Sequence, residues 1–61
     1  MNEFELKFRD SDSKELIGKI KDGFIPFTND VVLINGEKFL VSSRVISYDL
    51  RVAIVYGKLI E

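Results

Sequence analysis

The chain has 61 residues, 46% hydrophobic and 31% charged, with nine Lys and Arg against ten Asp and Glu and a formal charge of −1. This length allows a single domain, residues 1–61, and the hydrophobic content excludes a disordered chain. The absence of Cys and His excludes disulfides, Cys/His zinc sites and thiolate or imidazole catalysis. A single small core usually supplies no more than ~3–5 kcal/mol of net folding stability, so we expect the chain to be stabilised by an idealised core or by oligomerisation.

Residues 2–9 alternate strictly between apolar and charged or polar side chains. Phe4, Leu6 and Phe8 share one face, which is the period-2 pattern of a half-buried strand. The polar cluster at 10–13 ends this strand as a loop. The charged N-terminal segment is unlike a signal peptide, and no uncharged run approaches the ~18 residues that cross a bilayer, so we expect a cytoplasmic protein with no membrane partner.

The segment 14–22 fits two periods. As a strand it places Leu16, Gly18 and Ile20 inward; as a helix over 13–22 it has Asp12 as N-cap and Glu15 as the capping-box partner. Gly18 would weaken such a helix by ~1 kcal/mol relative to Ala, so the strand is favoured. The helix, packed on a four-stranded antiparallel sheet, stays as the alternative.

An apolar loop follows a turn predicted at Asp22-Gly23. Pro26 lacks an N–H group and pushes Ile25 toward extended geometry, so the segment is not a regular ladder strand. Either Phe24 or Phe27 plugs one open end of a barrel, or the loop is exposed and binds a partner. In the second case the partner-binding residues are Phe24, Ile25 and Phe27.

The second half of the chain predicts a three-stranded antiparallel meander. Asn35-Gly36 is a strong signal for a type I′ hairpin turn between strands that begin near residues 31 and 38. A connection at 48–51 leads to a final strand at 52–60. Five strands in 61 residues predict an all-β fold, a small SH3-like barrel or a curled antiparallel sheet.

The C-terminal strands are apolar on both faces. Phe39, Val41 and Val45 occupy one face, and further apolar residues occupy the other, which indicates that both faces are covered. The cover is a second copy of the chain, the segment 14–22 as a helix, or a single core reached through bulges or twist. The self-association residues expected for the dimer are Leu40, Ile46, Tyr48, Val55 and Leu59. As an edge, the last strand would pair with its symmetry mate, guarded only by Gly57 and Lys58.

No motif supports catalysis, a metal or a cofactor. Asp10-Ser11-Asp12 resembles the start of a calcium loop, but Lys14 stands at the third ligand position and Glu15 at the required glycine. The serines lack a His or Cys partner, and the glycines have no phosphate-loop spacing. We therefore expect a protein that is not an enzyme.

Nucleic-acid binding is the main alternative binding function. Lys14, Lys19 and Lys21 can form a basic stripe with Phe24 or Phe27 beside it. Neighbouring acidic residues dilute the stripe, and the net charge of −1 gives the wrong overall field for a polyanion.

Several turn and strand motifs of the chain form a recognisable pattern. They are Gly23-Phe24-Ile25-Pro26, Asn29-Asp30-Val31-Val32-Leu33-Ile34-Asn35-Gly36, Phe39-Leu40-Val41, Tyr48-Asp49 and Val52-Ala53-Ile54-Val55-Tyr56. With these motifs, the segment from Pro26 to Tyr56 resembles a family of small SH3-like β-barrel proteins encoded by phages and mobile elements of Gram-positive bacteria. Similar proteins tend to carry Gly where Asn29 stands. The resemblance covers about half of the chain, carries over no functional residue, and implies a compact barrel that binds and blocks a host protein.

These observations together predict a non-enzymatic protein-interaction module. We expect a phage-encoded homodimer in the bacterial cytoplasm that inhibits a host protein, such as an anti-phage defence component. The alternatives are a nucleic-acid-binding barrel and a virion or assembly component that packs in a ring.

Overall fold

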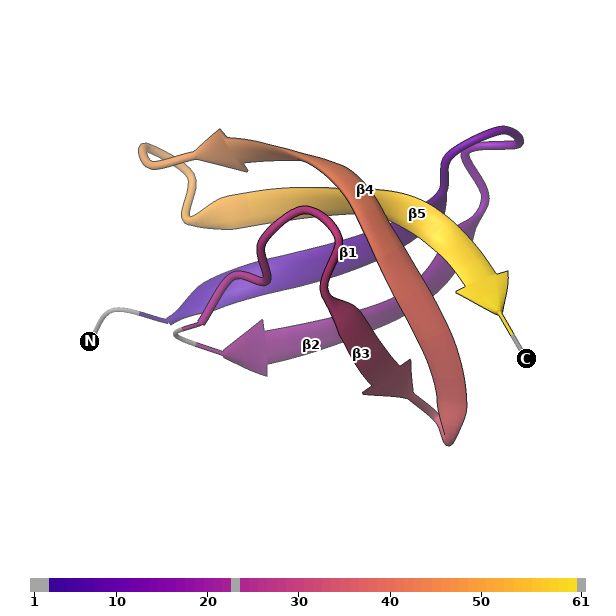
Figure 1. Ribbon diagram of the computed structural model, residues 1–61. Coiled ribbons are helices and arrows are strands. Elements are labelled where there is room, and N and C mark those ends of the chain that lie inside the picture. The colour runs from indigo at the N-terminus through magenta and orange to yellow at the C-terminus, as the bar shows by residue number, and fades with distance from the viewer. Residues whose placement is uncertain (1–2, 23, 61) are drawn as a thin grey trace.

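The computed structural model describes residues 3–22 and 24–60 as one all-β sheet of five strands, with no helix in these ranges (Figure 1). The strands are β1 Phe4–Asp10, β2 Leu16–Asp22, β3 Val31–Ile34, β4 Glu37–Ser47 and β5 Val52–Ile60. Their order in the sheet is β2-β1-β5-β4-β3, and the pair β1 and β5 is parallel whereas the other pairs are antiparallel. The sheet curls strongly into a half barrel, which confirms the all-β prediction and is consistent with a small SH3-like barrel.

The ambiguous segment 14–22 forms a strand, so the helical alternative is wrong. In β2, Ile20 lies opposite Leu6 and Gly18 lies opposite Phe8. A Cβ atom at Gly18 would fall 3.0 Å from Cγ2 of Ile34, so a small residue suits this position. The register shifts beside Phe8, and this bulge turns Ile17 toward the core and leaves Leu16 exposed. The predicted inward position of Leu16 is therefore wrong.

One apolar layer on the concave side of the sheet forms the core. The rings of Phe8 and Phe39 meet edge to face, with centroids 5.5 Å apart. The predicted inward face of the first strand is confirmed, since all three of its apolar residues are buried. The buried residues are Phe4, Leu6, Phe8, Ile34, Phe39, Val41, Ala53 and Val55.

A bulge at Ser42 divides β4 into two parts that face differently. Val41 pairs with Gly57 and Ser43 with Tyr56, so Ser42 is an extra residue in the ladder. Its hydroxyl donates a hydrogen bond to the carbonyl oxygen of Tyr56 at 3.2 Å. Beyond the bulge the inward and outward positions are exchanged.

This exchange corrects two sequence-based assignments. Val45 was expected beside Val41 on the inner face, but its side chain is 56% exposed. Ile46 was expected on the second face, but it packs against the core. A bulge that brings both apolar sets into one core was one of the alternatives left open.

The last strand is central in the sheet. β5 lies between β1 and β4, so the predicted edge at 52–60 is wrong. Val55 was expected among the self-association residues, but it is fully buried and therefore cannot contact a second copy at the surface. The remaining members of that set, Leu40, Tyr48 and Leu59, are exposed but do not share one face, because Leu40 and Leu59 lie on opposite faces and Tyr48 lies in a turn.

The predicted turns are confirmed where the structure describes them. Asn35 and Gly36 have φ values of 52° and 82°, which is the type I′ geometry expected for this dipeptide. The meander of β3, β4 and β5 is present as predicted, with a turn at 48–51. The predicted turn at Asp22-Gly23 includes a residue outside the described ranges.

Candidate partner-binding groove

The segment 24–30 joins β2 to β3 and passes across the open, concave side of the half barrel (Figure 1). Backbone hydrogen bonds fix it to β4. The N–H of Asn29 donates to the carbonyl oxygen of Val41 at 2.8 Å, and the N–H of Val41 donates to that of Asp30 at 2.9 Å. Asn29 has a φ of 74°, a conformation that Asn and Gly adopt readily. The loop is therefore part of the folded structure.

Arg44 provides a second attachment for this loop. The bulge at Ser42 places Arg44 on the inner side of β4, paired with Val55, where it is half-buried. Its Nη1 atom donates to the carbonyl oxygen of Pro26 at 3.3 Å, and its guanidinium carbon lies 4.7 Å from the ring centroid of Phe27. The sequence pattern does not point to Arg44, because alternation without a bulge places its side chain on the outer face.

Asp30 shapes the turn that precedes β3. Its Oδ2 atom accepts a hydrogen bond from the N–H of Phe27 at 2.9 Å, and its own N–H donates to the carbonyl oxygen of Phe27 at 3.1 Å. The side chain is exposed, and within the described part of the chain it forms no ion pair. The carboxylate of Asp30 therefore has no cationic partner among the described residues.

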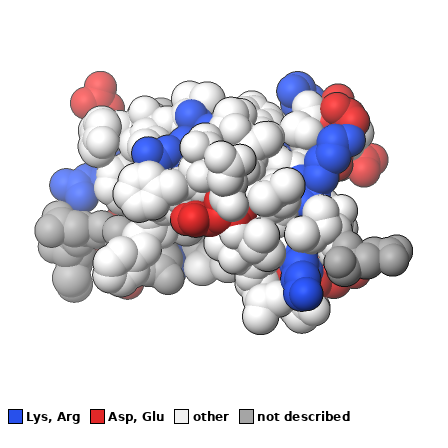
Figure 2. Space-filling model, in the orientation of Figure 1, with Lys and Arg blue, Asp and Glu red and all other residues white. Residues whose placement is uncertain are grey.

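A shallow groove of about 400 Å³ lies between this loop and the inner faces of β1 and β2. Its volume falls within the range of roughly 300–1,000 Å³ that is usual for ligand sites. Among the described residues that line it, Asp30 is the only charged one. Figure 2 shows this open side, which is mostly uncharged, with an acidic group near its middle. The lining residues are Leu6, Phe8, Ile20, Phe24, Ile25, Pro26, Phe27, Asp30 and Val32.

The three predicted partner-binding residues all line this groove, in two different states. Phe24 and Phe27 are 83% and 65% exposed. Ile25 is half-buried and packs against the core. Ile25 is thus the residue of this loop that packs against the core, whereas the two phenylalanines, one of which was expected to plug the barrel, remain on the surface.

The predicted basic stripe lies apart from these aromatic residues. Ile20 faces the concave side with Leu6, so its neighbours Lys19 and Lys21 lie on the convex face of β2. Lys14 lies in the turn before β2, and its Nζ atom is 4.9 Å from the ring centroid of Tyr56. The stripe and the aromatic loop are therefore on opposite sides of the sheet.

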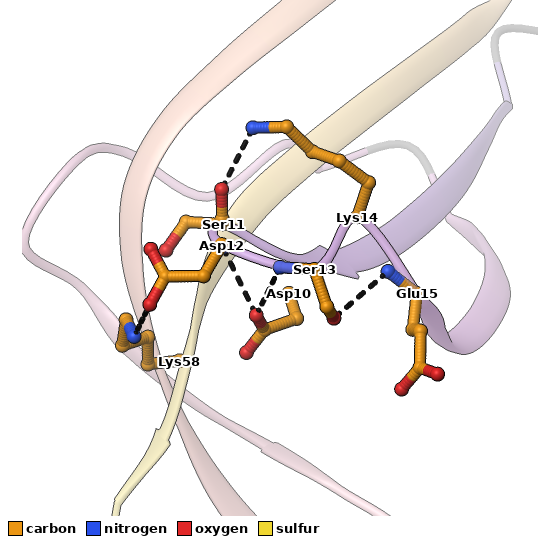
Figure 3. A network of polar contacts seen from close by, with 7 residues as sticks. All are labelled: Asp10, Ser11, Asp12, Ser13, Lys14, Glu15 and Lys58. Carbon is orange, nitrogen blue, oxygen red and sulfur yellow. Dashed lines mark hydrogen bonds and ion pairs between the residues drawn. The ribbon is translucent and has the colours of Figure 1, made fainter.

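The segment that resembles the start of a calcium loop is a structural turn (Figure 3). Oδ2 of Asp10 accepts hydrogen bonds from the N–H groups of Ser13 at 2.8 Å and Asp12 at 3.0 Å. These bonds, that from Ser13 above all, lower the pKa of Asp10. Asp12 forms an ion pair with Lys58, and this contact raises the pKa of Lys58.

The described residues also bear on metal binding and membrane insertion. No group of three or more His, Cys, Asp or Glu side chains among them is placed to hold a metal ion. No helix in the same ranges is long and apolar enough to span a membrane.

Comparison with protein-family models, with curated proteins and with solved structures finds no match for this chain.

Proposed function

We propose that this chain is a non-enzymatic protein-interaction module that binds a partner protein in the groove beneath the loop 24–30. The observation that carries the proposal is the pair of exposed rings, Phe24 and Phe27, on a loop held in place by Arg44 and by β4. Exposed aromatic residues on a preorganised surface lose little entropy on binding and are enriched in interaction sites. Because the loop 24–30 is held in place while its two rings stay exposed, we favour a role in binding for Phe24 and Phe27 over a purely structural role.

We further propose that binding inhibits a protein of a bacterial host, such as a component of anti-phage defence, in the host cytoplasm. The resemblance of residues 26–56 to small phage-encoded barrels supports this role. A rigid domain that occupies a functional surface of its target can inhibit it by steric exclusion, with no chemistry of its own and no cofactor.

Self-association is part of the proposal, and the two free edges of the sheet differ in their suitability for it. β2 is guarded by Lys19, Lys21 and a bulge, features that natural proteins use to block edge pairing. β3 contains no charge, Pro or Gly. Its outward residues Val31 and Leu33 are 51% and 68% exposed. We therefore assign the homodimer contact to the edge of β3.

The register of such a dimer follows from the β3–β4 hairpin. Ile34 and Glu37 flank a two-residue turn and form a hydrogen-bonded pair, so Val31 and Leu33 direct their N–H and C=O groups toward the open edge. Residues opposite each other in an antiparallel ladder share a face. A two-fold axis at Val32 places Val31 of one copy opposite Leu33 of the other. In this alignment the outward N–H and C=O groups of the two copies meet, and the paired side chains share one face of the sheet.

Nucleic-acid binding is the second candidate, and one observation favours it. On the convex face, Lys7 lies directly opposite Lys19, an arrangement of like charges that a phosphate would relieve. Glu5 lies within 3.9 Å of Lys19 and offsets part of this charge. Phosphate contacts give an affinity that falls steeply with salt, so a titration with a generic oligonucleotide at low and moderate salt tests this candidate.

A ring-forming assembly component is the third candidate. It would need the edge of β2 in one copy to pair with β3 in the next, a head-to-tail contact that generates rings. The lysines and the bulge of β2 oppose such pairing.

The experiment that tests the proposed function compares proteins captured from bacterial lysate by the wild type and by two variants. The double variant Phe24→Ser/Phe27→Ser removes both rings from the groove. Leu50→Ser removes an equally exposed apolar side chain from the turn between β4 and β5, outside the groove. We expect to find a protein that the wild type and Leu50→Ser both capture and that the double variant does not. When this protein is purified, it should bind the wild type and Leu50→Ser with similar affinity and the double variant more weakly. If no captured protein depends on the two phenylalanines, the proposal is wrong.

A further inference from the structure

We infer that the groove selects a protein segment in which a Lys or Arg side chain stands among apolar residues, with its cation on the carboxylate of Asp30. This inference rests on the proposed function and specifies the chemistry of the partner. It follows from the place of one charged side chain, that of Asp30, among described lining residues that are otherwise apolar.

The carboxylate of Asp30 is held in a defined position. Its Oδ2 atom accepts the N–H of Phe27 at 2.9 Å, and its backbone oxygen accepts the N–H of Val41 at 2.9 Å. A carboxylate can accept about four hydrogen bonds, so this turn contact leaves capacity for a ligand. A cation that approaches Asp30 therefore meets an acceptor whose orientation is already fixed.

The groove would penalise a partner without a positive charge. An apolar partner that covers Phe24, Phe27 and Ile20 also removes water from Asp30. A carboxylate buried without a partner carries a large desolvation cost, which a cation offsets. An acidic segment or a phosphate would be repelled in the same place. The carboxylate thus acts against competing ligands as well as in favour of a cationic one.

The aromatic rings beside Asp30 suit the same ligand. The contact of Arg44 with Phe27, 4.7 Å from guanidinium carbon to ring centroid, shows that a cation packs well against this ring. Arg44 forms no ion pair with Asp30 among the described residues, and its Nη1 atom donates to the carbonyl oxygen of Pro26. Phe24, 83% exposed, provides a second ring at the groove for the aliphatic part of a Lys or Arg side chain.

The test uses a displayed library of random peptides, selected on the full-length protein, with Asp30→Asn as the main variant. The Asn side chain still offers an oxygen to the N–H of Phe27, so the turn is preserved while the charge is lost. Asp49→Asn, an exposed Asp in the turn at 48–51, is the matched control. Peptides whose binding is lost in Phe24→Ser/Phe27→Ser are taken as groove ligands and measured by fluorescence titration.

We expect groove ligands of the wild type to be enriched in Lys or Arg between apolar residues. We expect Asp30→Asn to weaken them about five- to tenfold, the range of a partly exposed charge-assisted hydrogen bond. Asp49→Asn should change nothing, and Asp30→Lys should shift selection toward acidic peptides.

The other outcomes separate this inference from the proposed function. Groove ligands without basic enrichment, or with equal affinity for wild type and Asp30→Asn, overturn the inference and leave the interaction module standing. If no selected peptide depends on the phenylalanines, both fail. Should Asp30→Asn not fold, the enrichment pattern of the wild type alone decides.

Discussion

Gly57 of β5 lies so close to Leu40 of β4 that a Cβ atom at Gly57 would fall 2.0 Å from the Leu40 carbonyl oxygen. The same atom would fall 2.8 Å from Cε2 of Phe39, a fully buried ring. The contact lies immediately before the bulge at Ser42, where β4 changes the face that it presents. The absence of a side chain at Gly57 therefore allows the two longest strands to approach each other.

We expect Gly57→Ala to abolish stable folding. The obstacle is a main-chain oxygen, so the strands themselves must separate, and overpacking of this kind costs at least the upper end of about 1–3 kcal/mol. A domain of this size has only ~3–5 kcal/mol available. Urea unfolding followed by circular dichroism measures the effect.

Gly18→Ala is the control for this substitution. Its new Cβ atom would fall 3.0 Å from a side-chain methyl group of Ile34, which can shift by a few tenths of an ångström. We expect a loss of about 1 kcal/mol or less. Equal losses for the two variants would show that the contact of Gly57 with Leu40 is not a tight constraint.

The proposed dimer predicts a mass of about twice 7.0 kDa by light scattering, decreasing on dilution. Leu33→Lys should give a monomer, because it places charge at the unguarded edge of β3. Tyr48→Lys, at a 72% exposed position in the turn at 48–51, should leave the dimer intact. A wild type that is monomeric at every concentration would refute the β3 contact.

The register of the dimer can be tested separately. Leu33→Glu should weaken association, and the double variant Val31→Lys/Leu33→Glu should restore it, because each Lys then lies opposite a Glu of the other copy. Failure of the second substitution to restore the dimer would exclude the alignment centred on Val32. Val55→Glu is no test of the interface, since it buries a charge in the core.

Loss of the Arg44 side chain should loosen the loop 24–30. Arg44→Gln removes the bond to Pro26 and the contact with the ring of Phe27, at a cost of about 1 kcal/mol in unfolding free energy. We expect faster amide exchange at 24–28 with little change in β1. Lys58→Gln, which breaks a surface ion pair, is the control and should leave exchange in the loop unaltered.

The turn at 10–15 predicts a definite dependence of stability on acid. The pKa of Asp10 is lowered in the folded state, chiefly by the hydrogen bond from the N–H of Ser13. The contribution of this carboxylate to folding stability is therefore present above its unfolded-state pKa of about 3.9. It is lost as the pH falls through the lower pKa of the folded state. We expect Asp10→Asn to reduce the loss of folding stability between about pH 5 and pH 2. Parallel curves for wild type and Asp10→Asn would contradict this role.

Lys58 has the opposite dependence. The pKa of Lys58 is raised in the folded state, first by the hydrogen bond to Asp12. Its contribution to folding stability is therefore present below the unfolded-state pKa of about 10.4 and is lost as the pH rises through the folded-state pKa. Lys58→Gln should remove this alkaline loss when unfolding is followed above about pH 10.

The sequence was sufficient to predict those parts of the fold that depend on local pattern. The alternation of Phe4, Leu6 and Phe8 and the Asn35-Gly36 turn specify their own geometry, and the structure shows both. The faces of β4 beyond Ser42 could not be predicted, because a bulge adds one residue without a compositional signal and reverses the parity of all later positions. Val45 was misplaced for this reason, and Arg44 was overlooked.

The candidate site was predictable only in part. The composition of the loop pointed to Phe24, Ile25 and Phe27, which do line the groove. Asp30 gave no signal, since an Asp before a strand is common in turns. Its relation to the rings appears only when the loop is folded across β1.

The parallel pairing of β1 with β5 has a consequence for how the protein is made. Glu5 aligns with Val52 and Asp10 with Gly57. β1 is synthesised early, but it cannot pair with β5 until residues 52–57 have left the ribosome. Until then the nascent chain can form two separate hairpins, β1 with β2 and β3 with β4, each with one apolar face in water. The core cannot be complete before β5 is in place, because Ala53 and Val55 belong to it. Folding that depends on contacts so distant in sequence is slow for a domain of this size.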